Sequence, residues 1–310
     1  MRKSVYVILI CTVAIIISFI IRHSNNHPTE HRTLPKTQSM QKSIPTISQT
    51  AIPNFDHIVV LLLENKPAES ITDNSSAPYI NSLMKKYSYT TNYSAVANPS
   101  LPNYLALIGG STFNITSDCT SCFISSPDVV DNLEKAHKTW KAYMESMPSS
   151  CFIGSKDRYA QKHNPFIYFD DIRNNKDRCK NIVPYTELSG DLIDVKSTPH
   201  FVWITPDLCS DMHDCSVAHG DEWLSKQVPS ILNSPSFTSQ SSLLIITFDE
   251  GDKNNNKILT IFVGSQVKHN FVSHSLYTHY SLLHTIEASW GLPSLTENDA
   301  NADVMKDLFR

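Results

Sequence analysis

The sequence predicts an α/β fold with a mostly parallel central sheet and helices on both of its faces. Runs of consecutive apolar residues, such as "IVVLLL" at 58–63, end abruptly in polar residues, which is typical of strands buried on both faces. Segments with helical spacing lie between these runs. Strands that alternate with helices favour a parallel sheet covered on both sides.

Four apolar runs are expected to form strands, at 58–63, 200–207, 242–252 and 259–264. Three segments have helical spacing, at 77–87, 129–143 and 221–233. In the last of these, Leu224, Val228 and Ile231 share one face with Leu232, as expected of a helix that packs on a sheet. The chain shows no internal repeat.

Acidic residues follow three of the predicted strands. Glu64 closes the first, Asp207 follows the second, and Asp249 with Glu250 closes the third. Ligands of open α/β sheets collect beyond the carboxyl ends of the strands, so these acids are expected at one edge. Grouped carboxylates repel one another unless a cation lies among them. The group therefore predicts an oxygen-ligated metal site, whereas any single acid is explained more simply as a helix cap or a solvated turn.

The N-terminal fifty residues are expected to lie outside the folded domain. Basic residues flank an apolar run at 5–21, which predicts a signal peptide or a membrane anchor over 1–22. No A-x-A-like cleavage site follows the run, which favours the anchor. Either segment would place the rest of the chain outside the cytoplasm, as a secreted, periplasmic or membrane-anchored protein. Residues 23–50 are polar and unpatterned, as in a disordered linker, and 51–310 would form a single domain.

Cysteine usage agrees with export. Cys11 lies in the apolar run, and the other six form an even set that predicts three disulfides. Six cysteines allow 15 pairings, and the sequence does not choose among them. Two short loops are plausible, Cys119 with Cys122 and Cys209 with Cys215. A zinc or redox pair at "CTSC" is the alternative, but no second pair with metal-ligand spacing accompanies it.

The composition suits an ordinary globular protein and excludes one class of partner. The chain has 310 residues, of which 41% are hydrophobic and 18% are charged. The formal net charge of -4 gives no broad basic field, so we expect no binding to nucleic acid.

The segment "NPSLPNYLALIGG" at 98–110 places a hydroxyl at the start of a predicted helix. Pro102 suits the first helical turn, and Gly109 with Gly110 ends the helix. Ser100 would therefore lie where free N–H groups and the helix dipole favour an anion, either a phosphate or a serine alkoxide. Taken alone, the segment is explained more simply by an N-cap serine worth about 1 kcal/mol.

Six segments together resemble the bacterial phosphoesterase family of acid phosphatases and phospholipases C, within the alkaline phosphatase superfamily. They are "VVLLLEN", "NPSLPNYLALIGGST", "KHNPFIYFDDIRNN", "DLCSDMHDCSVAHGDEWL", "LLIITFDEGD" and "THYSLLHTIEASWGLP", in this order over roughly 55–295. The resemblance implies an alkaline-phosphatase-like fold, a catalytic domain over 51–310, and a site in which a serine or threonine attacks phosphorus beside a metal.

The resemblance also assigns the nucleophile and the metal ligands. Ser100 matches the nucleophile. Glu64 with Asn65 matches the first metal-binding pair, and Asp249 with Glu250 matches the second. The implied cofactor is a divalent metal ion whose identity the sequence leaves open. A serine hydroxyl is a weak nucleophile that needs such activation, and a cation would also neutralise the phosphate.

Substrate binding is expected from two further segments. Asn103 matches an asparagine that holds a non-bridging phosphate oxygen in related phosphodiesterases. His163 matches a family histidine, and with Lys162 and Asn164 it is expected to bind the phosphate, because positive groups offset the substrate's charge.

The leaving alcohol needs a proton, and histidine is the side chain best suited to supply it near neutral or mildly acidic pH. His213 and His279, which match family histidines, are the two candidates, and the sequence does not choose between them.

The chain also departs from the family pattern, at Asn98, Asp207, His219 and His284. The extra carboxylate of Asp207, with Asp211 and Asp214, suggests a second cation site. A turn bounded by Cys209 and Cys215 is the simpler explanation of these three acids.

The sequence predicts a metal-dependent phosphomonoesterase that acts through a phosphoserine on a small phosphate ester. A phosphodiesterase or phospholipase C on the same core is the nearest alternative, with phospholipid as a possible substrate and the N-terminal segment as the contact with a membrane. The short chain favours the monoesterase. A sulfatase is disfavoured because the chain lacks a "C-x-P-x-R" segment. An inactive, disulfide-stapled binding module is the alternative of another class.

Overall fold

The computed structural model describes residues 52–310. The predicted signal or anchor over 1–22 and the linker over 23–50 lie outside the described residues. Within 52–310, no helix has the length and apolar character needed to cross a membrane.

The centre of the fold is a nine-stranded sheet with the order β4-β3-β5-β1-β6-β7-β2-β8, in which β9 also pairs with β2. Its central strand β1 is parallel to both of its neighbours, β5 and β6. The predicted α/β fold with a mostly parallel sheet is thus confirmed. The strands are β1 (His57–Leu63), β2 (Ser88–Ser94), β3 (Trp140–Met144), β4 (Ile182–Pro184), β5 (Phe201–Thr205), β6 (Ser242–Phe248), β7 (Lys257–Gly264), β8 (Phe271–Ser273) and β9 (Tyr277–Thr278).

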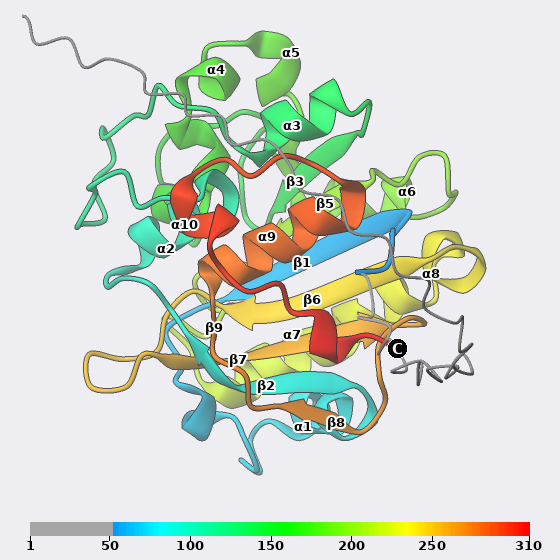
Figure 1. Ribbon diagram of the computed structural model, residues 1–310. Coiled ribbons are helices and arrows are strands. Elements are labelled where there is room, and N and C mark those ends of the chain that lie inside the picture. Colours follow the sequence, from blue (N-terminus) through cyan, green and yellow to red (C-terminus); the bar gives the residue numbers. More distant parts are fainter. Residues whose placement is uncertain (1–51) are drawn as a thin grey trace, which may run out of the picture. The chain divides into compact units, whose positions relative to one another are not determined.

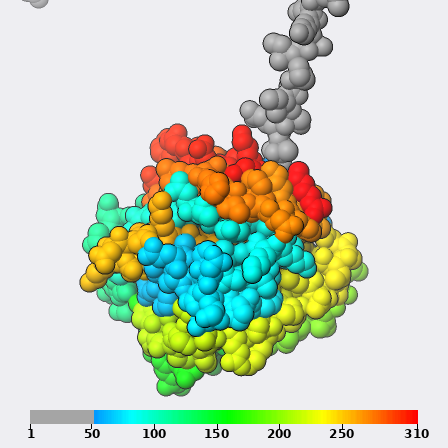
Figure 2. Space-filling view, turned by 90° about the horizontal axis from the view of Figure 1, so that it is seen from below, coloured from blue at the N-terminus to red at the C-terminus, as the bar shows by residue number. Residues whose placement is uncertain are grey.

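Helices cover both faces of the sheet. Figure 1 shows α9 in front of the strands and α7 behind them, and in Figure 2 the orange-to-red α9 and α10 lie on the opposite side from the yellow-green α7. Helix α2 packs against α9, and α1 packs against α7. The helices are α1 (Pro78–Lys86), α2 (Ser100–Gly109), α3 (Val129–Lys135), α4 (Asp170–Arg173), α5 (Lys176–Cys179), α6 (Leu188–Asp191), α7 (Val217–Leu232), α8 (Pro235–Ser239), α9 (His279–Trp290) and α10 (Glu297–Ala300).

Two predicted elements differ from the structure. The helix expected over 129–143 ends at Lys135, and Trp140–Met144 is strand β3, because pairing with both β4 and β5 satisfies its backbone. The strand expected at 259–264 is present as β7, but it runs antiparallel to β6. The connection over 249–256 contains no helix, so the chain turns back as a hairpin.

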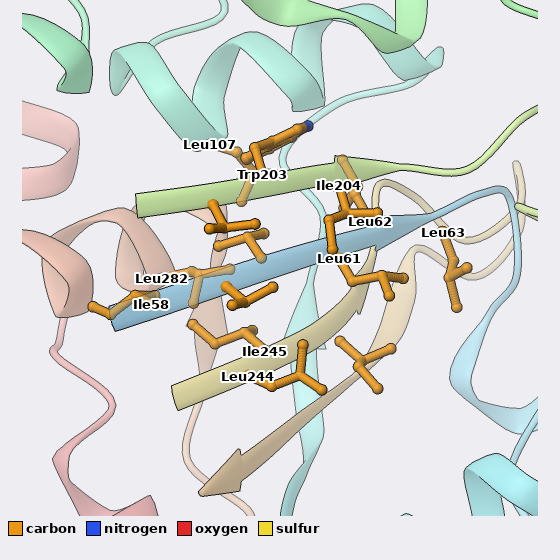
Figure 3. Packing of buried hydrophobic residues seen from close by; sticks show 14 of the residues in the cluster. Ile58, Leu61, Leu62, Leu63, Leu107, Trp203, Ile204, Leu244, Ile245 and Leu282 are labelled. Carbon is orange, nitrogen blue, oxygen red and sulfur yellow. The ribbon is translucent and has the colours of Figure 1, made fainter. Parts of the chain in front are cut away.

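The central strands are held by a continuous apolar core. Every residue of β1, β5 and β6 is buried. Figure 3 shows side chains of these strands packed together with Leu107 of α2 and Leu282 of α9. Each fully buried leucine or isoleucine contributes about 1.5–3 kcal/mol. The core therefore fixes the ends of β1 and β6, where the predicted acids begin.

Three disulfides join Cys119 to Cys122, Cys151 to Cys179, and Cys209 to Cys215. The predicted number and both predicted short loops are confirmed. The Cys119–Cys122 bond leaves no thiolate for a zinc site at "CTSC". Disulfides of this kind fit a protein that works outside the cytoplasm.

Candidate active site

The site begins where β1 ends. Glu64 is fully buried, and its backbone N–H donates to the carbonyl of Asp211 at 2.9 Å. Asn65 takes a left-handed backbone conformation, with φ 50°, which asparagine tolerates better than most residues. Its N–H then donates to Oδ1 of Asp249 at 3.0 Å, which ties the end of β1 to the end of β6.

Ser100 is the first residue of α2 and points at Glu64. Its Oγ–H donates to Glu64 Oε2 at 3.0 Å, and the side chain is buried. Pro99 occupies the N-cap position, and Ser100 itself makes no capping hydrogen bond to the helix. The N-cap explanation of Ser100 is therefore wrong. One turn further on, the hydroxyl of Tyr104 donates to Glu64 Oε1, so both oxygens of Glu64 face α2.

The acids after β6 join Glu64 in one buried cluster. Asp249 is fully buried and Glu250 is 4% exposed. Burial raises the pKa of Asp249 to about 6, although hydrogen bonds with Asn65, Ser100 and Glu64 act in the opposite direction. Burial and the neighbouring Asp249 raise the pKa of Glu250 to about 8. Burial, Asp249 and Asp211 raise the pKa of Glu64 well above its ordinary value.

Asp211 also belongs to this cluster, although the sequence favoured a place for it in the disulfide-bounded turn. It is fully buried, its Oδ2 lies 3.3 Å from Nδ1 of His163, and burial raises its pKa to about 8. Asp207, which was expected at the strand end, accepts hydrogen bonds from the N–H groups of Cys209 and Ser210 and so forms the disulfide-bounded turn. The sequence signal for Asp211 is its position in the loop that follows β5.

His163 lies inside the carboxylate cluster. Its Nε2 is 3.3 Å from Glu64 Oε1, and its ring stacks on Tyr104 with centroids 5.3 Å apart and planes 3° apart. Burial, Lys162 and His213 lower the pKa of His163 well below its ordinary value. A neutral imidazole has one N–H, so it cannot donate to both Glu64 and Asp211. The structure therefore groups His163 with the metal-binding candidates rather than with the phosphate binders that the sequence suggested.

Lys162 and His213 lie at the edge of this cluster. Lys162 Nζ is 3.2 Å from His213 Nε2 and donates to Asp118 Oδ2 at 3.0 Å. His213 Nδ1 contacts Asp214 Oδ1 at 2.7 Å, which orients the ring. The Nδ2 of Asn164 donates to the hydroxyl of Tyr159 rather than to either of these groups.

Asn103 does not fit its predicted role of holding a phosphate oxygen. Its Oδ1 accepts from the N–H groups of Val96 and Ala97, at 3.1 and 2.9 Å. Its Nδ2 donates to the carbonyls of Ala97 and Pro99, at 3.1 and 3.2 Å. Both amide hydrogens are thus used to hold the loop that leads into α2, and none is free for substrate.

His279 does not fit its predicted role as the proton donor. The side chain is fully buried at the start of α9. Its Nε2 donates to the backbone carbonyl of Asp249 at 2.5 Å, and its Nδ1 accepts from the hydroxyl of Tyr93 at 3.0 Å. Burial lowers the pKa of His279 to about 4, so the ring is neutral. The histidine holds Asp249 in place, which leaves His213 as the candidate acid.

The cluster fits a divalent cation. Within 52–310, four of its buried polar atoms have no hydrogen-bond partner: His163 Nε2, Asp211 Oδ2, Asp249 Oδ2 and Glu250 Oε2. One ligand atom from each of Glu64, His163 and His213 also lies within 4.8 Å of the other two. Unpaired buried carboxylates are costly unless they are protonated or bind a cation. Carboxylate oxygens with an imidazole are a ligand set for a divalent metal.

Comparison with known families identifies the family of this chain. Residues 69–293 match the Phosphoesterase family. This chain belongs to that family. The predicted family is thereby confirmed, whereas the reaction, the metal and the covalent intermediate stay predictions.

Two relatives show how far the similarity of this phosphoesterase extends. A phosphate-repressible acid phosphatase of Penicillium chrysogenum is 31% identical over 267 residues, covering 81% of this chain and 63% of the relative. A phosphatidylinositol-3-phosphatase of Mycobacterium tuberculosis is 31% identical over 268 residues, covering 85% of this chain and 86% of the relative. The chain therefore spans less than two thirds of the fungal protein and most of the mycobacterial one.

Solved structures confirm the fold of this phosphoesterase. A protein of the alkaline phosphatase superfamily from Vibrio parahaemolyticus has a TM-score of 0.56 and 12% identity, covering 80% of this chain and 69% of that one. The lipoteichoic acid synthase LtaP of Listeria monocytogenes has a TM-score of 0.56 and 11% identity, covering 84% of this chain and 76% of that one. At such identities the likeness concerns the fold alone.

Proposed function

We propose that this phosphoesterase hydrolyses phosphate monoesters outside the cytoplasm, with Ser100 as the nucleophile. The observation that carries the proposal is the hydrogen bond of 3.0 Å from Ser100 Oγ to Glu64. Among the described residues, the three other acids of this buried cluster each have an oxygen without a hydrogen-bond partner. Neither a helix cap nor an ordinary ion pair explains that combination. The N-terminal segment would export the domain or hold it at a membrane.

A divalent metal would be held by Glu64, Asp211 and Asp249, with Asn65, Glu250 and His163 beside them. When bound, such an ion neutralises phosphate charge and stabilises the charge that develops on oxygen in the transition state. The residues also account for the position of the nucleophile. Helix α2 starts at Ser100 and is buried along its whole length, so the hydroxyl is fixed by the core rather than by a mobile loop.

The reaction would proceed in two steps. Ser100 Oγ attacks phosphorus, the bond to the leaving oxygen breaks, and Glu64 Oε2 lies ready to accept the hydroxyl proton. His213 would give a proton to the leaving alcohol, because it lies at the edge of the cluster and Asp214 orients its ring. Water then attacks the phosphoserine and releases inorganic phosphate.

The substrate is proposed to be a monoester, either small and soluble or part of a lipid headgroup. One relative is called an acid phosphatase and another a phosphatidylinositol-3-phosphatase, and both names describe removal of a terminal phosphate. A phosphodiesterase or phospholipase C would use the same core, and it would differ in the groove for the leaving group.

The test compares rates on p-nitrophenyl phosphate, bis-p-nitrophenyl phosphate, vesicles with phosphatidylinositol 3-phosphate and vesicles of phosphatidylcholine. We expect the two monoesters to be turned over at least about 100-fold faster than the two diesters, given the discrimination that polar leaving-group sites can achieve. Acid quenching during turnover should trap a phosphate on the peptide that contains Ser100. Faster cleavage of the diesters would replace the monoesterase by a phospholipase C, and no turnover of any substrate would favour a binding module.

A further inference from the structure

Asp118 occupies the place beside the nucleophile where an anion would be expected. It lies between α2 and α3, and its Oδ1 accepts from the backbone N–H of Leu101 at 3.0 Å. Leu101 directly follows Ser100 in the first turn of α2. The other oxygen, Oδ2, forms an ion pair with Lys162 Nζ at 3.0 Å. One carboxylate therefore bridges a helix N-terminus and an ammonium group.

These two donors are what a phosphoryl group at Ser100 would need. First-turn N–H groups and lysine ammonium groups both bind phosphate oxygens. Asn103, the other candidate donor, is fully used by the loop before α2. With Asp118 in place, the N–H of Leu101 and one of the three N–H groups of Lys162 are occupied and do not bind a substrate phosphate. The carboxylate also adds negative charge to a region that already holds Glu64, Asp211 and Asp249.

The side chain of Asp118 is more exposed to solvent than those of the acids in the cluster. Its side chain is 28% exposed, whereas that of Glu64 is fully buried. The backbone just after it is anchored, because the carbonyl of Cys119 accepts from Tyr168 and that of Thr120 accepts from Gln161. A change of side-chain rotamer would thus remove the carboxylate from α2 without moving the loop.

We propose that Asp118 is a displaceable placeholder, whose carboxylate is replaced on Leu101 N–H and Lys162 Nζ by the phosphoryl group of the substrate. This inference rests on the proposed function. The carboxylate keeps the two donors paired and positioned when no substrate is bound, and it lowers the affinity of the site for phosphate. Asp118 then sets how tightly the site holds phosphate, the product as well as the substrate.

The test measures inorganic phosphate binding to the full-length, metal-loaded protein by titration calorimetry and as a competitive inhibition constant. Asp118→Asn keeps the shape of the side chain and removes its charge. We expect phosphate to bind at least about tenfold tighter to this variant, because a like charge near the anion is gone. Asp177→Asn is the matched control, since it removes the same charge from an exposed position on α5 and should leave phosphate binding unchanged.

A second variant pair links the effect to the shared donor. In a Lys162→Met background, Asp118→Asn should gain clearly less affinity than in the wild type, because one of the two donors is missing. Circular dichroism and melting temperature show that each variant is folded.

Two outcomes would overturn the placeholder while leaving the proposed function intact. Phosphate could bind Asp118→Asn as weakly as the wild type, or more weakly, while the wild type still hydrolyses p-nitrophenyl phosphate. Asp118 would then be a permanent clamp on Lys162. A wild type that neither hydrolyses the ester nor binds phosphate would instead overturn the proposed function, and the placeholder with it.

Discussion

Two groups of carboxylates in this molecule have similar composition and opposite surroundings. The strand-end cluster consists of Glu64, Asp211, Asp249 and Glu250. The arginine-bound cluster consists of Asp128, Asp131, Glu134 and Asp171, around α3 and α4. Three carboxylates of the second group lie as close together as metal ligands would, with one ligand atom of each within 4.8 Å of the others.

The difference lies in where the positive charge comes from. Arg178 reaches into the arginine-bound cluster, with Nη2 3.1 Å from Asp131 and Nε 3.2 Å from Glu134, and Nη1 also pairs with Asp171. In the strand-end cluster, the nearby lysines donate elsewhere, Lys162 to Asp118 and Lys66 to the carbonyl of Met212.

The two clusters also differ in how many of their buried oxygens lack a hydrogen-bond partner. Among the residues that the structure describes, the strand-end cluster leaves Asp211, Asp249 and Glu250 each with an oxygen that lacks a partner, and the other cluster leaves only Asp128 Oδ2. A group of acids therefore points to a metal when the fold supplies no cation of its own. Density of acids alone does not distinguish the two cases.

The largest expected effect separates the two clusters by catalysis. Ser100→Ala should lower kcat on p-nitrophenyl phosphate by at least about 1,000-fold, because the nucleophile is lost. Ser125→Ala is the control, since Ser125 also donates to a carboxylate, that of Asp170, but beside the arginine-bound cluster. Its kcat should stay near that of the wild type. A Ser100→Ala enzyme with more than half of the wild-type rate would contradict the assignment.

Metal binding should depend on one cluster and not on the other. Chelation should remove activity and lower the melting temperature of the wild type by about 5 °C, as expected for loss of an ion present at about 100 times its Kd. Asp249→Asn should show no such response to added divalent ions in calorimetric scans, whereas Asp171→Asn should respond like the wild type. An Asp249→Asn protein that still gains stability from the metal would refute the proposed site.

Removal of the internal cation should destabilise the arginine-bound cluster without affecting catalysis. Arg178→Met should lower the free energy of unfolding by about 3 kcal/mol, because its partners lose their counter-ion in a partly buried site. Urea denaturation measures the loss. The folded variant should keep the wild-type kcat. If Arg178→Met were as stable as the wild type, the acids around it would have found another cation, and the contrast between the clusters would fail.

The smallest expected effect concerns pH and the chelated protein. The native pKa of Asp249 is about 6 and that of Glu250 about 8, both above their ordinary values of 3.8 and 4.5. The native state therefore keeps protons that the unfolded state has lost. This stability is fully present below about pH 4 and is lost as the pH rises through 6 to 8.

Asp249→Asn should reduce that loss between pH 5 and 8 by about 1–2 kcal/mol, because one of the titrating groups is gone. Melting temperatures of the chelated proteins across this range provide the measurement, with Asp171→Asn as the control. Parallel pH profiles for wild type and Asp249→Asn would show that Asp249 does not carry the raised pKa.

Some of the site could be predicted because its signals are local. The apolar run 58–63 and the turn into Glu64 and Asn65 are continuous in the sequence, as are 242–248 and the acids that follow. Proline and glycine define α2, and thereby the position of Ser100. Parallel pairing of β1 with β6 then follows from the alternation of strands and helices, and it brings Glu64 and Asp249 together.

Other roles could not be predicted because they depend on partners that are distant in the sequence. His279 matches a family histidine, but its ring is held by Tyr93 and by the carbonyl of Asp249, from two other strands' ends. Asn103 lies one turn after the nucleophile, yet its amide is used by 96–99. The sequence of strand β3 has helical spacing, but the segment forms a strand because pairing with two neighbouring strands outweighs local propensity.

Local patterns in the sequence predicted the strand ends and the helix start at Ser100, because these depend on apolar runs and on backbone-restricting residues in short segments. The resemblance of six segments predicted the family. Which polar atoms are paired depends instead on contacts between segments that are distant in the sequence. Asp211 became part of the cluster, and Asp118 came to lie on Leu101 and Lys162, because separate loops meet at one edge of the sheet. Hydrogen bonds and charges act over a few ångströms in space, and that proximity is set by packing rather than by sequence order.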